Sequence, residues 1–597
     1  MTFDITRLQT RYEELRLERS GFTEVYREIA RLFAPGRYRD DTASDYHLRP
    51  YPIDSKLVNS TGVLSLRAMA AGLHGGMTSP VRPWFRLVLQ GNPTEVPEGL
   101  NAWLDLTTQV MQAVLHQSNF YSAVHGLYAD LGAFGTGLLV ETADEDGIHF
   151  HLCNPGEFVI DINSNNEVDT FYRRIHMTAR QIVDTFNNKN VPDFIKGQCE
   201  HTRNVTARYD VIHAVFPRNE FKTLGRIAST DKPYASVYFL LGSSSSSTGE
   251  LTGLGGKPSV LEEGGYDIFP AFAPRWDISN SDRYGISPAM QVLPDCKMLQ
   301  AMTTTLRKLQ HKAADPPLVV DQSLRATGVR LTPGGLSYFD STRTGMTPVA
   351  PIHQPDAQTL QYSMQAIQEV QEIINNGMYV ELFRTFLDDE RHNVTATEIS
   401  ARQSEKLVLL GPVLERLHKE LLQPVIQRTF ALMREWGALP SPPNNVDIIN
   451  VDVTFESVLA QAQRASLSAN IEQGVVFVGN LAQMAPEALD LLNADSTVRA
   501  YLDRVAAPAS MLREQGEVEM IRQRRAEQQA QQQQMAVGNQ ALAEAGVLAD
   551  AAKTMGETKL GQGSVLDNRL QELFVEPFQD GAEQDKFFRL ARRDFCG

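Results

Sequence analysis

The sequence predicts an α+β fold that is predominantly helical. Several long segments repeat apolar residues at spacings of three and four, which is the period of an amphipathic helix. Between about residues 81 and 278, short runs of β-branched and aromatic residues alternate with turn residues, a pattern typical of strands. The chain has 597 residues, of which 42% are hydrophobic, so it is long enough for several domains with cores of their own.

Two helices are expected first. The apolar spacing predicts a helix over 5–33, which Pro35-Gly36 should end. A second helix is expected from about Ser55 to Leu73, where His74-Gly75-Gly76 would end it because glycine tolerates a positive φ. These glycines follow a helix, whereas a phosphate-binding loop lies before one, where the free N–H groups are.

Most of the strands are expected in the next two hundred residues. A short strand at 84–91 precedes a helix at 100–117, and 121–163 predicts a further helix followed by strands. Strand-like pieces continue over 205–278. They are interrupted at 243–259 by a Ser/Gly-rich stretch of low complexity, which is typical of a flexible excursion.

Two long helices then flank a short strand-rich segment. The first covers 287–313 and should end at Asp315-Pro316-Pro317, because the residue before a proline avoids helical geometry. Strand and turn residues follow over 314–355, and a helix resumes over 356–384.

A helix of about forty residues is expected after this pair. Thr395 and Glu398 form a T-x-x-E capping box at its start, and Pro412 and Pro424 are expected to kink it.

The C-terminal part predicts helices of a different character. Residues 459–492 and 496–505 are amphipathic. Residues 510–535 are polar nearly all round, as in a helix that is solvated or packed against copies of itself. From Gly538 onward the content of Gly, Ala and Gln predicts loose order.

Charge and composition argue against several classes of protein. Lys and Arg total 56 against 72 Asp and Glu, a formal net charge of −16, whereas proteins that grip nucleic acid carry a basic excess. The charged N-terminus does not fit a signal peptide, and no run of about 18 apolar residues predicts a membrane span. The four scattered cysteines form no CxxC pair, which favours a reducing compartment over a disulfide framework or a zinc site.

No catalytic, metal-binding or cofactor-binding motif is complete. The stretch GLGGKPS at 253–259 partly matches the phosphate-loop motif GxxxxGK[ST]. However, Leu251 stands where that motif needs its first glycine, and Pro258 stands where it needs a serine or threonine hydroxyl. His149 and His151 share one strand face without further spaced ligands, so a polar strand face is favoured over a metal site. The acidic triplet at 388–390 fits a solvated loop better than a two-metal centre, which needs ligands from other segments.

A series of short stretches carries a resemblance. In order, they are YREIARLFAPGR, IDSKLVNSTGVLSLRAMAAGLHGGMTSPVRPWFRL, GAFGTGLLVE, NPGEFVIDINSNNEVDTFYRRIHMTARQIVDTF, YGISPAMQVLPDCKMLQ…DPPLVV, TATEISARQSEKLVLLGPVLERLHKELLQPVIQR and VTFESVLAQAQR. This series resembles the head-to-tail connecting (portal) proteins of short-tailed, double-stranded DNA bacteriophages, over about residues 10–530. In that family the PWF stretch is a structural corner, so Trp84 and Phe85 are expected to be a buried anchor.

The resemblance implies a portal fold with named regions. On this sequence they would be a wing over 1–286, a stem helix over 287–313, a clip over 314–355, a second stem helix over 356–384, a tunnel loop over 385–395, a wing helix and closing strand over 396–459, a crown or helical barrel over 460–537, and a loosely ordered segment over 538–597.

The family's function gives further expectations. Its members form a ring, usually of twelve subunits, at one capsid vertex of the virion, and double-stranded DNA passes through the ring during packaging and ejection. The implied partners are further copies of the chain, the terminase large subunit, tail adaptor and nozzle proteins, and capsid and scaffolding proteins, with assembly in the host cytoplasm and no membrane. An acidic chain suits a channel for DNA, because a channel that bound phosphate tightly would hold the DNA fast.

The tunnel loop supplies the candidate site residues. The stretch FRTFLDDERHNV mixes both signs of charge, and in a ring these charges would form stacked circles around the DNA. The candidates are Arg384, Asp388, Asp389, Glu390, Arg391 and His392. In a single chain the same stretch is an ordinary surface loop, and that interpretation stays open.

Two other functions remain to be weighed. Another tail or capsid structural protein, such as an adaptor or a tube, would also be acidic, oligomeric and without motifs. The helix–strand–helix arrangement over 287–383 favours the portal instead. A terminase-like ATPase or nuclease would need the phosphate loop and acidic cluster that the sequence lacks.

Overall fold

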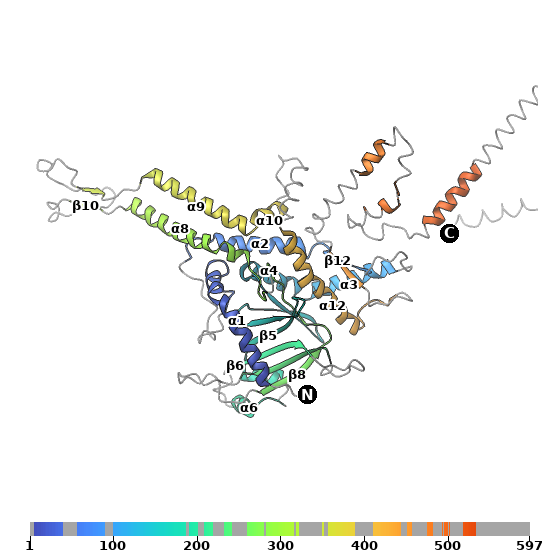
Figure 1. Cartoon of the computed structure of the whole chain (residues 1–597), viewed down its shortest axis with the longest axis horizontal. Coiled ribbons are helices and arrows are strands. Elements are labelled where there is room, and N and C mark those ends of the chain that lie inside the picture. Colours follow the sequence, from blue (N-terminus) through green and yellow to red (C-terminus); the bar gives the residue numbers. More distant parts are fainter. Residues whose placement is uncertain are drawn as a thin grey trace, which may run out of the picture. The chain divides into compact units, whose positions relative to one another are not determined.

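The computed structural model divides the chain into two units, Met1–Leu512 and Arg513–Gly597. It describes residues 5–39, 57–89, 100–186, 190–200, 208–218, 232–241, 259–279, 282–315, 318–320, 349–351, 356–387, 410–442, 451–455, 474–481, 492–493, 495–498, 501 and 518–532. Helices and antiparallel sheets both occur within these residues, which confirms the α+β prediction (Figure 1).

The first helix forms as predicted. Helix α1 spans Ile5–Leu32, and Gly36 follows it with a φ of 84°, a value that glycine adopts without strain. Leu8, Tyr12 and Leu15 are buried against the five-stranded sheet, where the Tyr12 ring lies 6.0 Å from that of Tyr172. The helix therefore covers one face of this sheet.

The second helix does not end where the glycines were expected to end it. Helix α2 spans Thr61–Met77 and includes His74, Gly75 and Gly76, none of which has a positive φ. The prediction of a glycine stop is wrong because Met77 is fully buried in the main core, and its burial offsets the roughly 1 kcal/mol that each glycine costs a helix.

The largest sheet has five antiparallel strands in the order β4-β5-β6-β7-β8. The strands are β4 (Phe158–Ile162), β5 (Val168–Thr178), β6 (Arg208–Pro217), β7 (Tyr234–Leu240) and β8 (Ser259–Tyr266). Two short helices, α5 (Ala179–Thr185) and α6 (Asp193–Glu200), share a hydrophobic cluster with one end of the sheet face opposite α1. The sequence did not predict β8, which directly follows the Ser/Gly-rich stretch.

A second sheet has the order β3-β2-β9. Its strands are β2 (Leu138–Asp144), β3 (Gly147–Cys153) and β9 (Ala271–Phe272). His149 and His151 lie on its polar face, where the ring nitrogen of His149 is 3.2 Å from Asp144 and that of His151 is 3.1 Å from Thr142.

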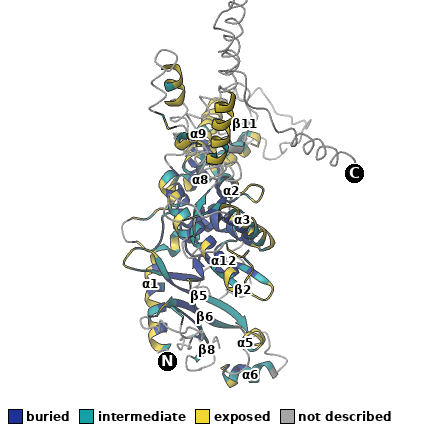
Figure 2. Cartoon of the chain, turned by 90° about the vertical axis from the view of Figure 1, so that its right-hand side faces the viewer, coloured by how far each residue is buried: buried dark blue, intermediate teal, exposed yellow. Residues whose placement is uncertain are grey.

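The main hydrophobic core is built mostly from helices. Helices α3 (Leu100–Gln117) and α4 (Phe120–Phe134) contribute to it together with α2, and β1 (Phe85–Leu89) pairs with β12 (Val451–Phe455) at its edge. Trp84 and Phe85 are 1% and 0% exposed, which confirms the expected buried anchor. Figure 2 shows the buried residues gathered around these elements.

The first predicted long helix is divided in two. Helix α7 (Pro288–Gln291) begins with the Ser287 hydroxyl accepting a hydrogen bond from the backbone N–H of Met290 at 3.0 Å. Helix α8 (Leu293–Ala314) starts anew after Val292. A continuous helix over 287–313 is therefore wrong in detail, because Pro294 has no N–H to donate and fits only a first turn. Beyond α8, β10 (Leu318–Val320) pairs with β11 (Val349–Pro351).

The second predicted long helix is divided as well. Helix α9 spans Ala357–Gly377 and α10 spans Val380–Leu387. Between them Tyr379 has a φ of 57°, which is strained for a residue with a side chain. The expected single helix over 356–384 is thus broken, and its last part extends to Leu387.

The next helix leaves α geometry before its second proline. Residues 410–417 are α-helical, His418–Leu422 form a π-helical turn, and α12 covers Gln423–Glu435 with Pro424 in its first turn. The predicted capping box at Thr395 and Glu398 lies outside the described residues. Past 455, helical pieces occur at 474–481, 495–498 and 518–532, and the last is almost entirely exposed.

A buried ion pair joins α12 to β2. Glu141 and Arg428 are 0% and 4% exposed, and Arg428 Nε lies 3.3 Å from Glu141 Oε2. Burial raises the pKa of Glu141 from 4.5 to about 7, although the charge of Arg428 and a hydrogen bond from Thr429 oppose this shift. Protonated Glu141 therefore contributes stability that is fully present below pH 4.5 and is lost as the pH rises through about 7.

Replacing this carboxyl by an amide should change how stability depends on pH. We compare the free energy of unfolding of Glu141→Gln with that of the unchanged chain. This difference should favour the variant by about 1–2 kcal/mol more at pH 8 than at pH 5, because only the carboxyl becomes charged between these pH values. Denaturant midpoints of both proteins at the two pH values measure the difference. An equal effect of the substitution at both pH values would contradict the raised pKa.

Candidate functional site: the helices that lead to the tunnel loop

The pair formed by α8 and α9 is fixed to α2 by polar side chains at its base. The Ser65 hydroxyl donates a hydrogen bond to Asn375 Oδ1 at 2.7 Å, and the Gln371 amide donates one to the Thr61 hydroxyl at 3.1 Å. Figure 1 shows α8 and α9 side by side, with α2 at one end of the pair and β10 near the other. Hydrogen bonds to α2 therefore fix the base of this helix pair. The outer half of the pair carries many exposed residues.

The segment before α2 is also joined to α8 by hydrogen bonds. The Gln300 side-chain oxygen accepts hydrogen bonds from the backbone N–H groups of Val58 and Asn59, each at 3.0 Å, and its amide donates to the Asn59 carbonyl at 2.7 Å. A single glutamine thus satisfies three backbone groups that would otherwise lack partners. Lys297 adds an ion pair to Glu28 of α1 at 2.5 Å.

The junction between α9 and α10 is tightly packed. Met378 is fully buried, and a Cβ on Gly377 would lie 2.3 Å from Cγ1 of Val292, so only glycine fits there. Tyr379, which follows Met378, has a positive φ and separates α9 from α10. Its ring centroid lies 6.1 Å from that of Trp276. Such strain persists only where surrounding contacts fix the backbone, as they do here.

Helix α10 is pressed against α2. Phe383 is 1% exposed, and a Cβ added to Gly72 would lie 2.2 Å from its Cγ. The two helices can approach this closely only because Gly72 has no side chain. The position of α10, the helix before the predicted tunnel loop, is therefore set by this contact.

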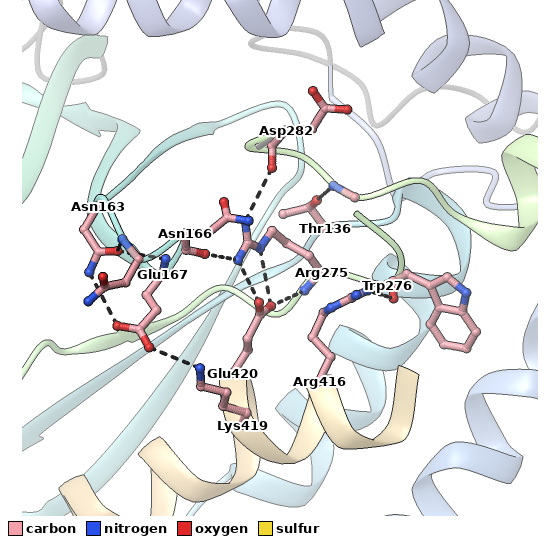
Figure 3. Close-up of polar contacts among 12 residues, drawn as sticks. Thr136, Asn163, Asn166, Glu167, Arg275, Trp276, Asp282, Arg416, Lys419 and Glu420 are labelled. Carbon is pink, nitrogen blue, oxygen red and sulfur yellow. Dashed lines mark hydrogen bonds and ion pairs between the residues drawn. The ribbon is translucent and has the colours of Figure 1, made fainter. Parts of the chain in front are cut away.

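A buried arginine connects the neighbouring strands to the π-helical turn. Arg275 is 1% exposed, and its Nη2 lies 2.7 Å from Glu420 Oε1 while its backbone N–H donates to Oε2 at 2.9 Å. Nη2 also donates to the carbonyl of Asn166 at 2.7 Å (Figure 3). We call Arg275 and Glu420, with the groups they bind, the polar junction. Charge-assisted bonds with two points of contact fix direction as well as distance.

The polar junction continues toward Tyr379 through the next residue. The carbonyl of Trp276 accepts a hydrogen bond from Arg416 Nη1 at 2.8 Å, and the Trp276 ring meets Tyr379. Lys419, next to Glu420, pairs with Glu167 at 3.3 Å, and both of these side chains are exposed (Figure 3). The break between α9 and α10 thus contacts Trp276, and the π-helical turn contacts Arg275, the residue directly before it.

The structure describes only one of the candidate tunnel-loop residues in its secondary structure. Arg384 belongs to α10. The other five, Asp388, Asp389, Glu390, Arg391 and His392, lie outside the described residues, so their grouping stays a prediction.

The sequence did not point to the residues that position α10. Gly72, Arg275, Tyr379 and Glu420 belong to no motif, and Arg275 and Glu420 are 145 residues apart. The only signal was the run of Arg275 and Trp276 after a strand, which is too common to be specific. Within the described part of the chain, His, Cys, Asp and Glu form no group of three or more that could hold a metal ion. No helix described there is long and apolar enough to cross a membrane.

Comparisons with known proteins agree with the resemblance. A family model described as "Bacteriophage head to tail connecting protein" matches residues 6–512. The portal protein of Salmonella phage epsilon15 is 33% identical over 565 residues, which cover 94% of this chain and 97% of that protein. The probable portal protein of Bordetella phage BPP-1 is 33% identical over 575 residues, covering 94% and 96%.

A solved structure also matches, at a low level. The neck of an empty gene transfer agent particle is 10% identical, with a TM-score of 0.30, over 69% of this chain and 86% of that one. A TM-score this low supports no argument. The family match and the two relatives suffice: the chain belongs to the bacteriophage head-to-tail connecting protein family.

Proposed function

We propose that the chain is the portal subunit of a short-tailed phage, and that it forms a ring at one capsid vertex and joins head to tail. Membership of the connecting family carries this proposal. The epsilon15 and BPP-1 relatives, named as portal proteins and aligned over nearly their whole length, add support. The tail-tube and adaptor alternatives have no comparable support.

The ring would conduct double-stranded DNA during packaging and ejection. The net charge of −16 per chain, repeated around a ring, repels DNA over a Debye length of about 10 Å and keeps it from binding the wall. On this proposal α7, α8 and α9 belong to the stem, β10 and β11 to the clip, α1 to α6 and α12 to the wing, and the helical pieces after 460 to the crown.

The mass of the purified particle tests the proposal. One chain has a mass of 66.5 kDa, so a ring of twelve would have about 800 kDa. Electron microscopy of the same sample should show rings with a central channel. A stable monomer at micromolar concentration and moderate salt would contradict the proposal.

The clip is proposed to meet the terminase large subunit during packaging and the tail adaptor afterwards. Replacing residues 318–350 by a short Gly/Ser linker should leave the rest of the chain folded, because β10 and β11 pair with each other in a two-stranded sheet of their own. We expect the variant to form rings that bind neither partner in pull-down experiments. Binding at the original level would place the docking surface elsewhere.

The tunnel loop is proposed to make weak, rapid contacts with phosphate. We expect Arg384→Ala combined with Arg391→Ala to leave assembly and melting temperature nearly unchanged but to alter filling or retention of DNA in proheads. Arg180→Ala with Lys196→Ala removes two positive charges from α5 and α6 and serves as the control, which should fill normally. Normal filling and retention in the tunnel-loop variant would refute its role.

A further inference from the structure

Among the described residues, the face of the five-stranded sheet opposite α1 is covered at its two ends. At one end Val211, Leu240 and Leu261 pack under α5 and α6. At the other end Phe171 and Val215 pack against the three-stranded sheet. Between these clusters lies a cavity of about 480 Å³, within the size range of pockets for small ligands.

The strand register places a row of polar side chains across the floor of this cavity. Arg173 of β5 is opposite His213 of β6, His213 is opposite Tyr238 of β7, and Tyr238 is opposite Glu262 of β8. The His213 and Tyr238 rings stack in parallel with centroids 4.0 Å apart. Arg173 and Glu262 are therefore at opposite ends of the row, separated by three strand spacings or roughly 14 Å.

Arg173 brings a positive charge to the floor without an acidic partner. Its Nε donates to His213 Nδ1 at 3.0 Å, and its guanidinium contacts the neutral groups of Cys153 and Tyr238. Among the described residues, no carboxylate forms an ion pair with it. A cation that is partly removed from water and lacks a counter-ion is costly, so this arrangement favours an anion supplied from outside.

His213 leaves the Ser236 hydroxyl as a second hydrogen-bond donor for the cavity. Burial and the charge of Arg173 hold the pKa of His213 well below its ordinary value, so the ring is neutral. Because Nδ1 accepts from Arg173, the ring proton is on Nε2, which lies 3.0 Å from the Ser236 hydroxyl and donates to it. The Ser236 proton is then left for another acceptor, and Ser236 lines the cavity.

The other walls select the kind of anion. Ile175, Met177 and Phe186 give the cavity an apolar side. Glu262, exposed at the far end, would repel a second negative charge. Glu263, which also lines the cavity, is paired with Arg218 at 3.4 Å. A nucleotide or another polyanion is therefore disfavoured, whereas one carboxylate attached to an apolar body matches the charge of Arg173 and the apolar side.

We propose that this cavity, lined by Arg173, Ser236 and Phe186, is a binding site for a monocarboxylate with an apolar body. The carboxylate accepts hydrogen bonds from the Arg173 guanidinium and the Ser236 hydroxyl, and the apolar part lies against Phe186 and Met177. The same chemistry is offered by a small organic acid and by the C-terminal residue of a protein.

Titration calorimetry of the full-length chain tests the site with hexanoate and its uncharged analogue hexanamide. We expect hexanoate to bind and hexanamide to bind at least about tenfold more weakly, because a charge-assisted hydrogen bond is lost. A short peptide ending in leucine, with a free or an amidated C-terminus, distinguishes the two sources. Tighter binding of the free-acid peptide than of hexanoate points to a protein C-terminus, and the reverse order points to a small acid.

Variants move the affinity in opposite directions. Arg173→Met should reduce hexanoate binding at least tenfold, while Glu262→Gln, at an exposed position, should increase it about two- to fivefold at low salt. Arg180→Met, on the outside of α5, is the matched control and should change nothing. If Arg173→Met fails to fold, the gain with Glu262→Gln and a loss with Ser236→Ala decide the question. Equal binding of hexanoate and hexanamide, or no binding of any carboxylate, would overturn the proposal.

Discussion

Replacing Gly72 by alanine is expected to destabilise the chain by about 3 kcal/mol, although alanine is the better helix former. The new Cβ would lie 2.2 Å from Cγ and 2.4 Å from Cβ of Phe383. The Phe383 Cβ cannot turn away without its backbone, so α10 has to move away from α2. Denaturant midpoints of the purified chain measure the loss.

The same helix offers a matched control. A Cβ on Gly75 meets nothing within 4 Å, and Gly75 has no positive φ, so Gly75→Ala should stabilise the chain by up to about 1 kcal/mol. In the background of Phe383→Gly the cost of Gly72→Ala should disappear, since this variant removes the Phe383 Cβ as well as the ring. A cost that persists in this background would show that the contact with α10 is not its cause. If α10 leads into the tunnel loop as proposed, Gly72→Ala should also disturb DNA retention.

Removing the arginine of the polar junction should have the largest effect. We expect Arg275→Met to cost about 3–5 kcal/mol, because Glu420 and the Asn166 carbonyl keep their burial but lose the bonds from the guanidinium. The Arg275 side chain is 1% exposed and that of Glu420 is 19% exposed, so water replaces little of what is lost. Chemical denaturation again gives the magnitude.

Two further variants separate the charge effect from packing. Arg275→Met with Glu420→Met should recover much of the loss, since no unpaired charge is left behind. Lys419→Met, which removes the adjacent exposed pair with Glu167, should stay within about 0.5 kcal/mol of the unchanged chain. A loss of similar size in Lys419→Met would mean that the π-helical turn tolerates no substitution and that the pair has no special role.

The sequence by itself determined the elements whose causes are local, and the family. The helices over 5–33 and 100–117 follow from apolar spacing within one segment, and they form where the spacing places them. The seven short stretches in their order pointed to the connecting family, which the family match bears out, and the resemblance implied the burial of Trp84 that the structure confirms. The tunnel-loop residues from Asp388 to His392 are a prediction that only the functional experiments address.

Only the tertiary structure decided where helices break and what holds α10. The glycines of α2 do not end it, because burying Met77 contributes more free energy than the glycines cost the helix. Tyr379 takes a positive φ because Gly377, Met378 and the Trp276 ring fix its surroundings. Arg275 forms its ion pair with Glu420, which lies 145 residues further along the chain. Each of these features depends on residues that meet only after folding, so no window of neighbouring residues contains its cause.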